Sequence, residues 1–197
     1  MTSDTDRVDE LSRAVDQTEA IISRVRPDQA ALPTPCDPWD VRALVGHVVH
    51  DVRQFTARAR GGETNTEESR TPAIGDDWVG AYRQAADSLL GAWRKEGAVE
   101  RTVELPFGTV PATWFVGQQL ADLVVHGWDI AKATGQSTEL DPELGRFALE
   151  WGKENLRPQF RGKEFAAEVP VGDDAPVHDR LAGFFGRDPS WTPPSSA

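Results

Sequence analysis

The chain carries four histidines and a single cysteine, and these residues limit the chemistry that its side chains could perform. One cysteine excludes an internal disulfide and an all-thiolate zinc site. A metal site would therefore depend on histidine and carboxylate ligands. Asp122 and His126 have the most suggestive spacing, because residues four apart lie on one face of a helix. His47 is the histidine that a second helix could bring beside them.

Two histidines and one carboxylate suit a divalent metal, because they supply two neutral nitrogens and one anionic oxygen and leave positions open for water or substrate. His47 flanks the apolar stripe of its predicted helix, and Asp122 and His126 flank the stripe of theirs. Packing of the two helices would bring both flanks together. The same spacing also fits an alternative without a metal, in which Asp122 and His126 form a surface pair and His47 is a half-buried core residue. His50 points almost directly away from its stripe, which predicts that it lies in solvent and is dispensable.

The elements that must position these residues are mostly helical. Hydrophobic periodicity predicts helices over about residues 5–26, 38–60, 77–93, 111–134, 142–151 and 177–185, four of them long enough for a bundle. Alternation between Val99 and Leu105 predicts a short strand, and residues 168–171 predict a second one.

Helix boundaries follow from capping residues. Asp37 is expected to cap the helix that contains His47, with Pro38 at its first position and Asp40 as the capping-box acid. Gly135 is expected to end the longest helix. Residues 61–69 are the expected flexible loop, and residues 192–197 are the expected frayed tail.

Length and composition exclude several function classes. The 197 residues, with 39% hydrophobic and 27% charged residues, predict one globular domain spanning 1–197. A net charge of −11 opposes binding to nucleic acid or to an anionic membrane surface. We expect neither a signal peptide nor a transmembrane helix, and therefore a cytoplasmic protein. No glycine-rich phosphate loop, serine-centred elbow or CxxC pair is present in the sequence.

Three segments resemble the signatures of one family: TPCDPWDVRALVGHVV at 34–49, LADLVVHGWDIAKATG at 120–135 and LAGFFGRDPSW at 181–191. Together they resemble the actinobacterial metal-binding branch of the DinB-like superfamily, which is related to the N-terminal domain of mycothiol-dependent maleylpyruvate isomerase. The resemblance implies a mostly α fold, a DinB-like four-helix bundle with additional helices and a small β element. It also implies a divalent metal, zinc first with nickel as an alternative, held by His47, Asp122 and His126; iron is a further alternative that follows from the ligand types alone. The isomerase relatives often have Glu at the position of Asp122.

The leading hypothesis from this resemblance is a metal-dependent enzyme that activates a low-molecular-weight thiol for transfer to, or isomerisation of, a small electrophilic substrate. The thiol of the family is mycothiol. No catalytic residue beyond the metal ligands is expected, because the metal itself stabilises the thiolate. A non-catalytic metal-binding module is one alternative, and a non-haem Fe(II) oxygenase, which uses the same ligand types, is another. The expected partners are the thiol and the substrate, and the chain is expected to be a monomer or homodimer.

Two polar residues beside the ligand pair each have two interpretations. Asp129, about one turn after His126, is either an acceptor that holds a metal ligand in place or a solvated surface acid. Gln119, one turn before Asp122, is either a donor to a bound water or substrate or a polar residue at the core boundary. The tryptophans are expected to fill the bundle core rather than to form an aromatic cage.

Three other residues stay outside the predicted site. Cys36 is either a reactive thiol or a small hydrophobe that packs at the start of a helix. Arg187 either binds a substrate carboxylate or caps the last helix. His178 lies in a polar stretch and is assigned no role.

Overall fold

A computed structural model describes residues 4–62, 74–162 and 165–193. Its helices are α1 (Asp4–Ile22), α2 (Val41–Ala59), α3 (Trp78–Trp93), α4 (Ala112–Thr134), α5 (Pro142–Asn155) and α6 (Val177–Phe184). Short 3₁₀ turns follow α1 at Pro27–Gln29 and α5 at Pro158–Phe160. Most of the expected loop at 61–69 and the end of the expected tail lie outside the described residues.

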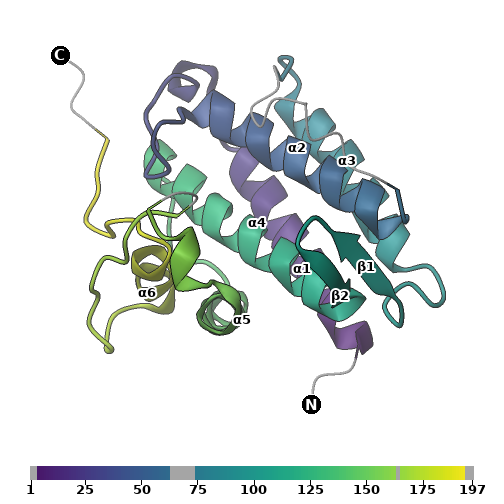
Figure 1. Cartoon of the computed structure of the whole chain (residues 1–197). Helices are drawn as coiled ribbons and strands as arrows, with labels where there is room; N and C mark the ends of the chain where they lie inside the picture. Colours follow the sequence, from purple (N-terminus) through teal and green to yellow (C-terminus); the bar gives the residue numbers. More distant parts are fainter. Residues whose placement is uncertain (1–3, 63–73, 163–164, 194–197) are drawn as a thin grey trace.

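The first four helices form the bundle (Figure 1). Helix α1 packs against α4 and α3, and α2 packs against α3 and α4. Helix α5 packs on α4, and α6 packs on α5 and α4. The fold is therefore mostly α, as predicted, and consistent with a DinB-like bundle that carries two additional helices.

A β hairpin connects α3 to α4. Strands β1 (Thr102–Leu105) and β2 (Gly108–Pro111) pair antiparallel, with Val103 opposite Val110. The small β element is confirmed, although only its first strand was predicted. The predicted strand at 168–171 is wrong: this segment lies against α6, where the Val169 amide donates to the carbonyl of Gly183 (2.9 Å), instead of pairing with a strand.

Helix α2 begins later than its capping pattern predicts. Its N-cap is Asp40, whose carboxylate accepts from the amide of Ala43 at 2.7 Å, so the prediction of Asp37 as the cap is wrong. The physical reason is a tight loop before the helix, in which the Thr34 hydroxyl donates to the carbonyl of Trp39 at 2.8 Å. This loop holds residues 34–39 beside the start of α2, where they contribute to the site described below.

The starts of α3 and α5 and the end of α4 agree with their predicted capping residues, whereas α1 ends at Ile22 instead of near residue 26. Asp77 caps α3 and Asp141 caps α5, each accepting backbone amides of its first turn. Gly135 ends α4 with φ 69°, a left-handed conformation that glycine adopts without strain. The long helix that carries Asp122 and His126 therefore has the predicted extent.

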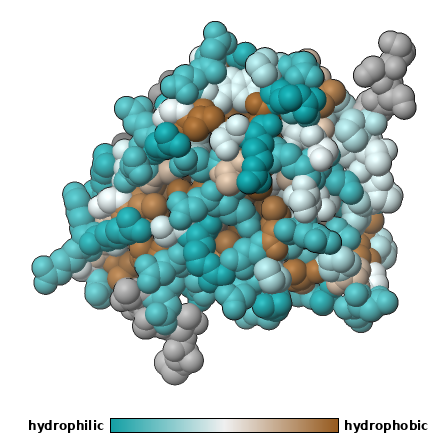
Figure 2. Space-filling view, turned by 180° about the vertical axis from the view of Figure 1, so that it is seen from behind, coloured by the Kyte–Doolittle hydropathy of each residue, from teal (hydrophilic) through white to brown (hydrophobic). Residues whose placement is uncertain are grey.

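Hydrophilic residues cover most of the molecular face in Figure 2, with hydrophobic residues in small patches between them. None of the described helices is long and apolar enough to cross a membrane.

Candidate metal centre

His47, Asp122 and His126 converge between α2 and α4. One ligand atom from each residue lies within 4.8 Å of those of the other two. The two imidazole rings meet edge to face, with centroids 5.1 Å apart. Helix packing therefore brings together the residues that the sequence pattern selected.

Burial distinguishes this cluster from an ordinary surface pair. His47 and His126 are only 7% and 8% exposed, so His126 is not a surface residue and His47 is more than half-buried, whereas the Asp122 side chain is 22% exposed. Within α4, Asp122 Oδ1 lies 3.7 Å from Nε2 of His126, one helical turn away. The distance is too long for a hydrogen bond, and it leaves the carboxylate facing the imidazoles without binding them tightly.

One carboxylate oxygen of Asp122 lacks a hydrogen-bond partner among the described residues. This oxygen, Oδ2, is buried. Burial raises the pKa of Asp122, and the positive charge that His126 can carry opposes this shift. Buried carboxylate oxygens normally have a partner, and a divalent cation held by two imidazoles would provide one. The donor set and the orphaned oxygen therefore fit a metal ion.

His126 lies in surroundings that favour positive charge. Burial lowers the pKa of its imidazole, but the charge of Asp122 and the hydrogen bond with Asp129 outweigh burial and raise the pKa well above its usual value. A position between two carboxylates stabilises a cation, whether the cation is a proton or a metal ion.

The position of Asp129 distinguishes an internal acceptor from a solvated surface acid. Its side chain is fully buried, and its Oδ2 lies 3.1 Å from Nδ1 of His126. It is therefore an internal acceptor and not a solvated surface acid. Its contact with Nδ1 leaves Nε2 of His126 to face Asp122, the usual way in which an outer carboxylate orients a histidine ligand.

Arg187 reaches this carboxylate from the end of the chain. It is 8% exposed, and both Nε (3.2 Å) and Nη2 (2.9 Å) donate to Asp129. Its Nη1 donates to the carbonyl of Phe185 at 2.8 Å, which confirms a capping role at α6. Burial would raise the pKa of Asp129, but the guanidinium charge and the contact with His126 hold it below its usual value. The internal carboxylate takes the place of the substrate carboxylate that the other interpretation assigned to Arg187.

The loop before α2 covers the cluster with two further side chains. The Trp39 ring lies 4.2 Å from that of His47 and 6.3 Å from that of His126, measured between centroids. Trp39 is partly buried and packs against the core as well as against these rings, and Trp128 is buried at 1% exposed. Cys36 is half-buried, and its Sγ accepts from Nη2 of Arg187 at 3.1 Å.

Sequence reasoning missed Asp51. Its Oδ2 lies 3.4 Å from Nε2 of His47, one turn away on α2. The signal was present in the sequence, because Asp51 follows His47 at the same spacing of four residues that separates Asp122 from His126.

His50 is buried, with 7% of its surface exposed, so the prediction that it lies in solvent is wrong. Residues 44–50 of α2 are buried without interruption, because α3 and α4 both pack against this helix. The apolar stripe therefore does not mark a single inner face. Neither potential ligand group of the described chain includes His50.

Two other polar residues are core components. Gln119 is fully buried and its Oε1 accepts from Nε1 of Trp93 at 2.8 Å, so it lies in the core and not at its boundary. His178 is 4% exposed and packs against Gly145, where a Cβ would lie 2.8 Å from the imidazole. Burial lowers the pKa of His178.

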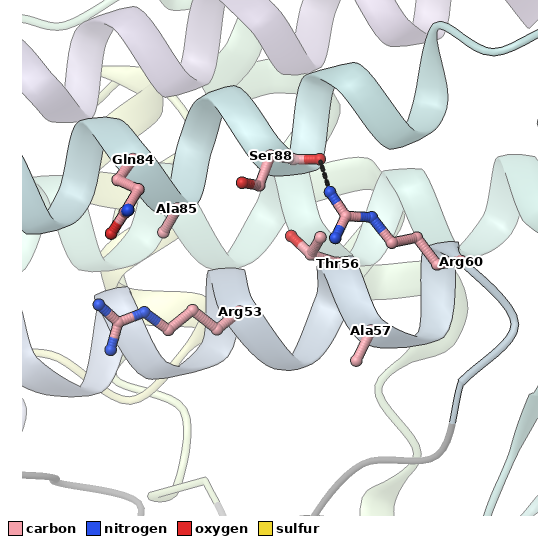
Figure 3. Close-up of a pocket in the computed structure, with 7 residues that line it drawn as sticks. All are labelled: Arg53, Thr56, Ala57, Arg60, Gln84, Ala85 and Ser88. Carbon is pink, nitrogen blue, oxygen red and sulfur yellow. Dashed lines mark hydrogen bonds between the residues drawn. The ribbon is translucent and has the colours of Figure 1, made fainter.

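A separate groove of about 280 Å³ lies between α2 and α3 (Figure 3). Arg53 and Arg60 border it, and Nη2 of Arg60 donates to the carbonyl of Ser88 at 3.4 Å. Both arginines are exposed, and the groove shares no residue with the buried cluster.

Residues 11–131 match the family model of the mycothiol maleylpyruvate isomerase N-terminal domain. The chain belongs to this family. The matched region includes all three residues of the cluster and ends before Arg187.

Similarity to a curated protein and to solved structures agrees with this match. An uncharacterised protein found in two strains of Mycobacterium tuberculosis is 39% identical over 177 residues, which cover 89% of this chain and 94% of that protein. Crystal structures of the mycothiol-dependent maleylpyruvate isomerase and of one of its mutants align with a TM-score of 0.63 and 16% identity. The alignment covers 84% of this chain and 74% of the isomerase, and it shows a shared fold.

Proposed function

We propose that this protein is a divalent-metal-dependent enzyme that activates a low-molecular-weight thiol for transfer to, or isomerisation of, a small electrophilic substrate. The observation that carries the proposal is the convergence of two buried imidazoles and one carboxylate with ligand atoms within 4.8 Å. Membership of the mycothiol maleylpyruvate isomerase N-terminal domain family supports mycothiol as the thiol.

His47, Asp122 and His126 would hold the metal. The two imidazoles contribute neutral nitrogen donors, and Asp122 contributes the one negative charge of the set. Zinc suits this mixture of nitrogen and carboxylate ligands, and three protein ligands leave a position for an external group. When bound there, the cation would lower the pKa of a coordinated thiol, so that the thiolate is abundant near neutral pH.

The residues around the ligands hold and shield them. Asp129 accepts from Nδ1 of His126 and keeps Nε2 directed toward Asp122. The Trp39 ring lies beside both imidazoles, 4.2 Å from His47 and 6.3 Å from His126 between centroids, and forms an apolar side of the cluster. A low local dielectric strengthens the interaction of Asp122 with a cation.

Metal content and thiol turnover test the proposal together. We expect the purified protein to bind one equivalent of zinc and, with mycothiol present, to convert at least one of a panel of small electrophiles that includes maleylpyruvate. Transfer would consume one equivalent of mycothiol, and isomerisation would return it. His47→Ala should lose both properties. His50→Ala is the matched control, because it removes a buried histidine one turn away on the same helix, and it should keep both.

Each other outcome overturns part or all of the proposal. Metal bound without turnover of any electrophile contradicts the enzyme and leaves a metal-binding module. Turnover that requires Fe(II) and consumes oxygen identifies an oxygenase instead. Equal zinc binding by the wild type and His47→Ala contradicts the ligand set itself.

A further inference from the structure

His126 belongs to two overlapping groups of potential ligands. The first is the group His47, Asp122 and His126, and the second is Cys36, His126 and Asp129. The ligand atoms of each group lie within 4.8 Å of one another. A thiolate, an imidazole and a carboxylate are a good zinc set by composition. The sequence and the local geometry therefore offer two places for one metal.

A guanidinium already lies at the second group. Arg187 Nη2 donates both to Asp129 Oδ2 at 2.9 Å and to Cys36 Sγ at 3.1 Å. Its Nε donates to Asp129 at 3.2 Å, and Nη1 is bound to the carbonyl of Phe185. All three guanidinium nitrogens are therefore hydrogen-bonded, and the permanent positive charge lies beside Cys36 and Asp129.

Within the described part of the chain, no arginine or lysine is hydrogen-bonded to Asp122 or His126 of the first group. Asp122 Oδ2 has no hydrogen-bond partner among the described residues, and Nε2 of His126 lies 3.7 Å from Oδ1. Two cations at the second group would repel each other in a buried environment, whereas a metal ion at the first group meets the carboxylate oxygen of Asp122 that lacks a hydrogen-bond partner among the described residues. The groups therefore differ in that the Arg187 guanidinium contacts two donors of the second group directly, whereas its charge acts on Asp122 without a hydrogen bond.

We propose that Arg187 is a positioning residue that occupies the second ligand group as a fixed cation and thereby confines a divalent metal to His47, Asp122 and His126. The inference rests on the proposed metal site. Arg187 also anchors Asp129, which holds Nδ1 of His126 and leaves Nε2 as the ligand atom. The segment that carries Arg187 follows α6 and lies beyond the matched family region, so it completes a site that the bundle helices begin.

Cobalt(II) is the probe for the test, because its absorption spectrum reports whether a cysteine sulfur binds the metal. We expect cobalt(II) on the wild type to show no thiolate-to-metal charge-transfer band, and Cys36→Ser to leave its affinity unchanged. Arg187→Gln removes the charge but keeps a hydrogen-bonding side chain, and it should produce the band. In that background, Cys36→Ser should abolish the band and weaken binding by at least about tenfold, and His47→Ala should have little effect.

Two further variants separate positioning from folding. Arg187→Lys keeps the positive charge and should show no band, which also provides a test if Arg187→Gln fails to fold. Arg161→Gln is the matched control. Arg161 donates to the Phe184 carbonyl at 2.5 Å, so it stabilises the same end of α6 without contacting either ligand group. It should bind cobalt(II) like the wild type.

The proposal for Arg187 and the proposal for the metal site fail in different ways. The role of Arg187 is overturned if Arg187→Gln binds cobalt(II) with no sulfur band and with the wild-type dependence on His47. It is equally overturned if the wild type already shows the band. The metal site itself is overturned if the wild type and all variants bind no cobalt(II) or zinc.

Discussion

His126 on α4 and His178 on α6 are both buried, at 8% and 4% exposed, but their surroundings differ in charge. His126 lies between Asp122 and Asp129, which raise its pKa well above the usual value. His178 packs against a glycine of α5, its Nε2 has no hydrogen-bond partner among the described residues, and burial lowers its pKa. Burial alone therefore does not make a histidine part of a site. The charges of Asp141 and Asp179 oppose the shift at His178 without outweighing burial, whereas at His126 a charge and a hydrogen bond from two carboxylates outweigh it.

Removing the carboxylate charge of Asp122, beside His126, is expected to have the largest effect on zinc affinity. Asp122→Asn keeps the size of the side chain but leaves a dipositive ion with two neutral imidazoles. We expect zinc affinity to fall by at least about 10–100-fold, the usual cost of altering even an outer partner of a metal ligand. Isothermal titration with zinc measures the change.

Asp179→Asn is the control in the other region, because Asp179 is the neighbour of His178 on α6. It should leave zinc binding unchanged. Equal zinc affinity for Asp122→Asn and the wild type would remove the carboxylate from the site and leave a two-histidine arrangement too weak for the proposed chemistry.

His50→Ala tests whether a buried histidine beside the cluster contributes to metal binding or only to packing. We expect the free energy of unfolding to fall by about 1–3 kcal/mol, because truncation leaves a cavity between packed helices. Zinc stoichiometry should stay at the wild-type value. Denaturant unfolding measures the first quantity and elemental analysis the second, and a variant that folds but loses its zinc would place His50 in the ligand set.

A smaller effect is expected from Asp122→Glu. This change keeps the charge and adds one methylene, which the helix can accommodate by a small side-chain adjustment. Zinc affinity should fall less than in Asp122→Asn, and the free energy of unfolding should stay near the wild-type value. If titration shows Asp122→Glu to be as weak as Asp122→Asn, then the position of the carboxylate matters as much as its charge.

The smallest effect concerns the pH dependence at His178. Because its pKa in the folded protein lies below the ordinary 6.5, the unfolded chain binds more protons around that pH. The stability contributed by the neutral imidazole is therefore present above about pH 6.5 and is lost as the pH falls. His178→Gln does not titrate, so its unfolding free energy should fall less than that of the wild type between about pH 7 and pH 5. Parallel pH profiles for the two proteins would contradict a depressed pKa.

Local spacing predicted much of the site. The stacking of Asp122 on His126 depends only on the pitch of one helix, and Gly135 ends that helix as its conformational freedom implies. The resemblance of segments 34–49 and 120–135 to one family then selected His47 as the third member. The same local reasoning failed for His50, because an apolar stripe identifies one buried face and α2 is covered on more than one.

The sequence by itself determined the helices, several of their caps and the spacing of Asp122 and His126, because these depend on interactions between residues a few positions apart. Only the tertiary structure decided that Asp129 is buried against Nδ1 of His126 and that Arg187, 58 positions later, neutralises it. The physical reason is that the charge around a buried group is set by the side chains that other elements bring to it. The packing of α6 on α4 and α5, and not any local pattern, brings that arginine to the site.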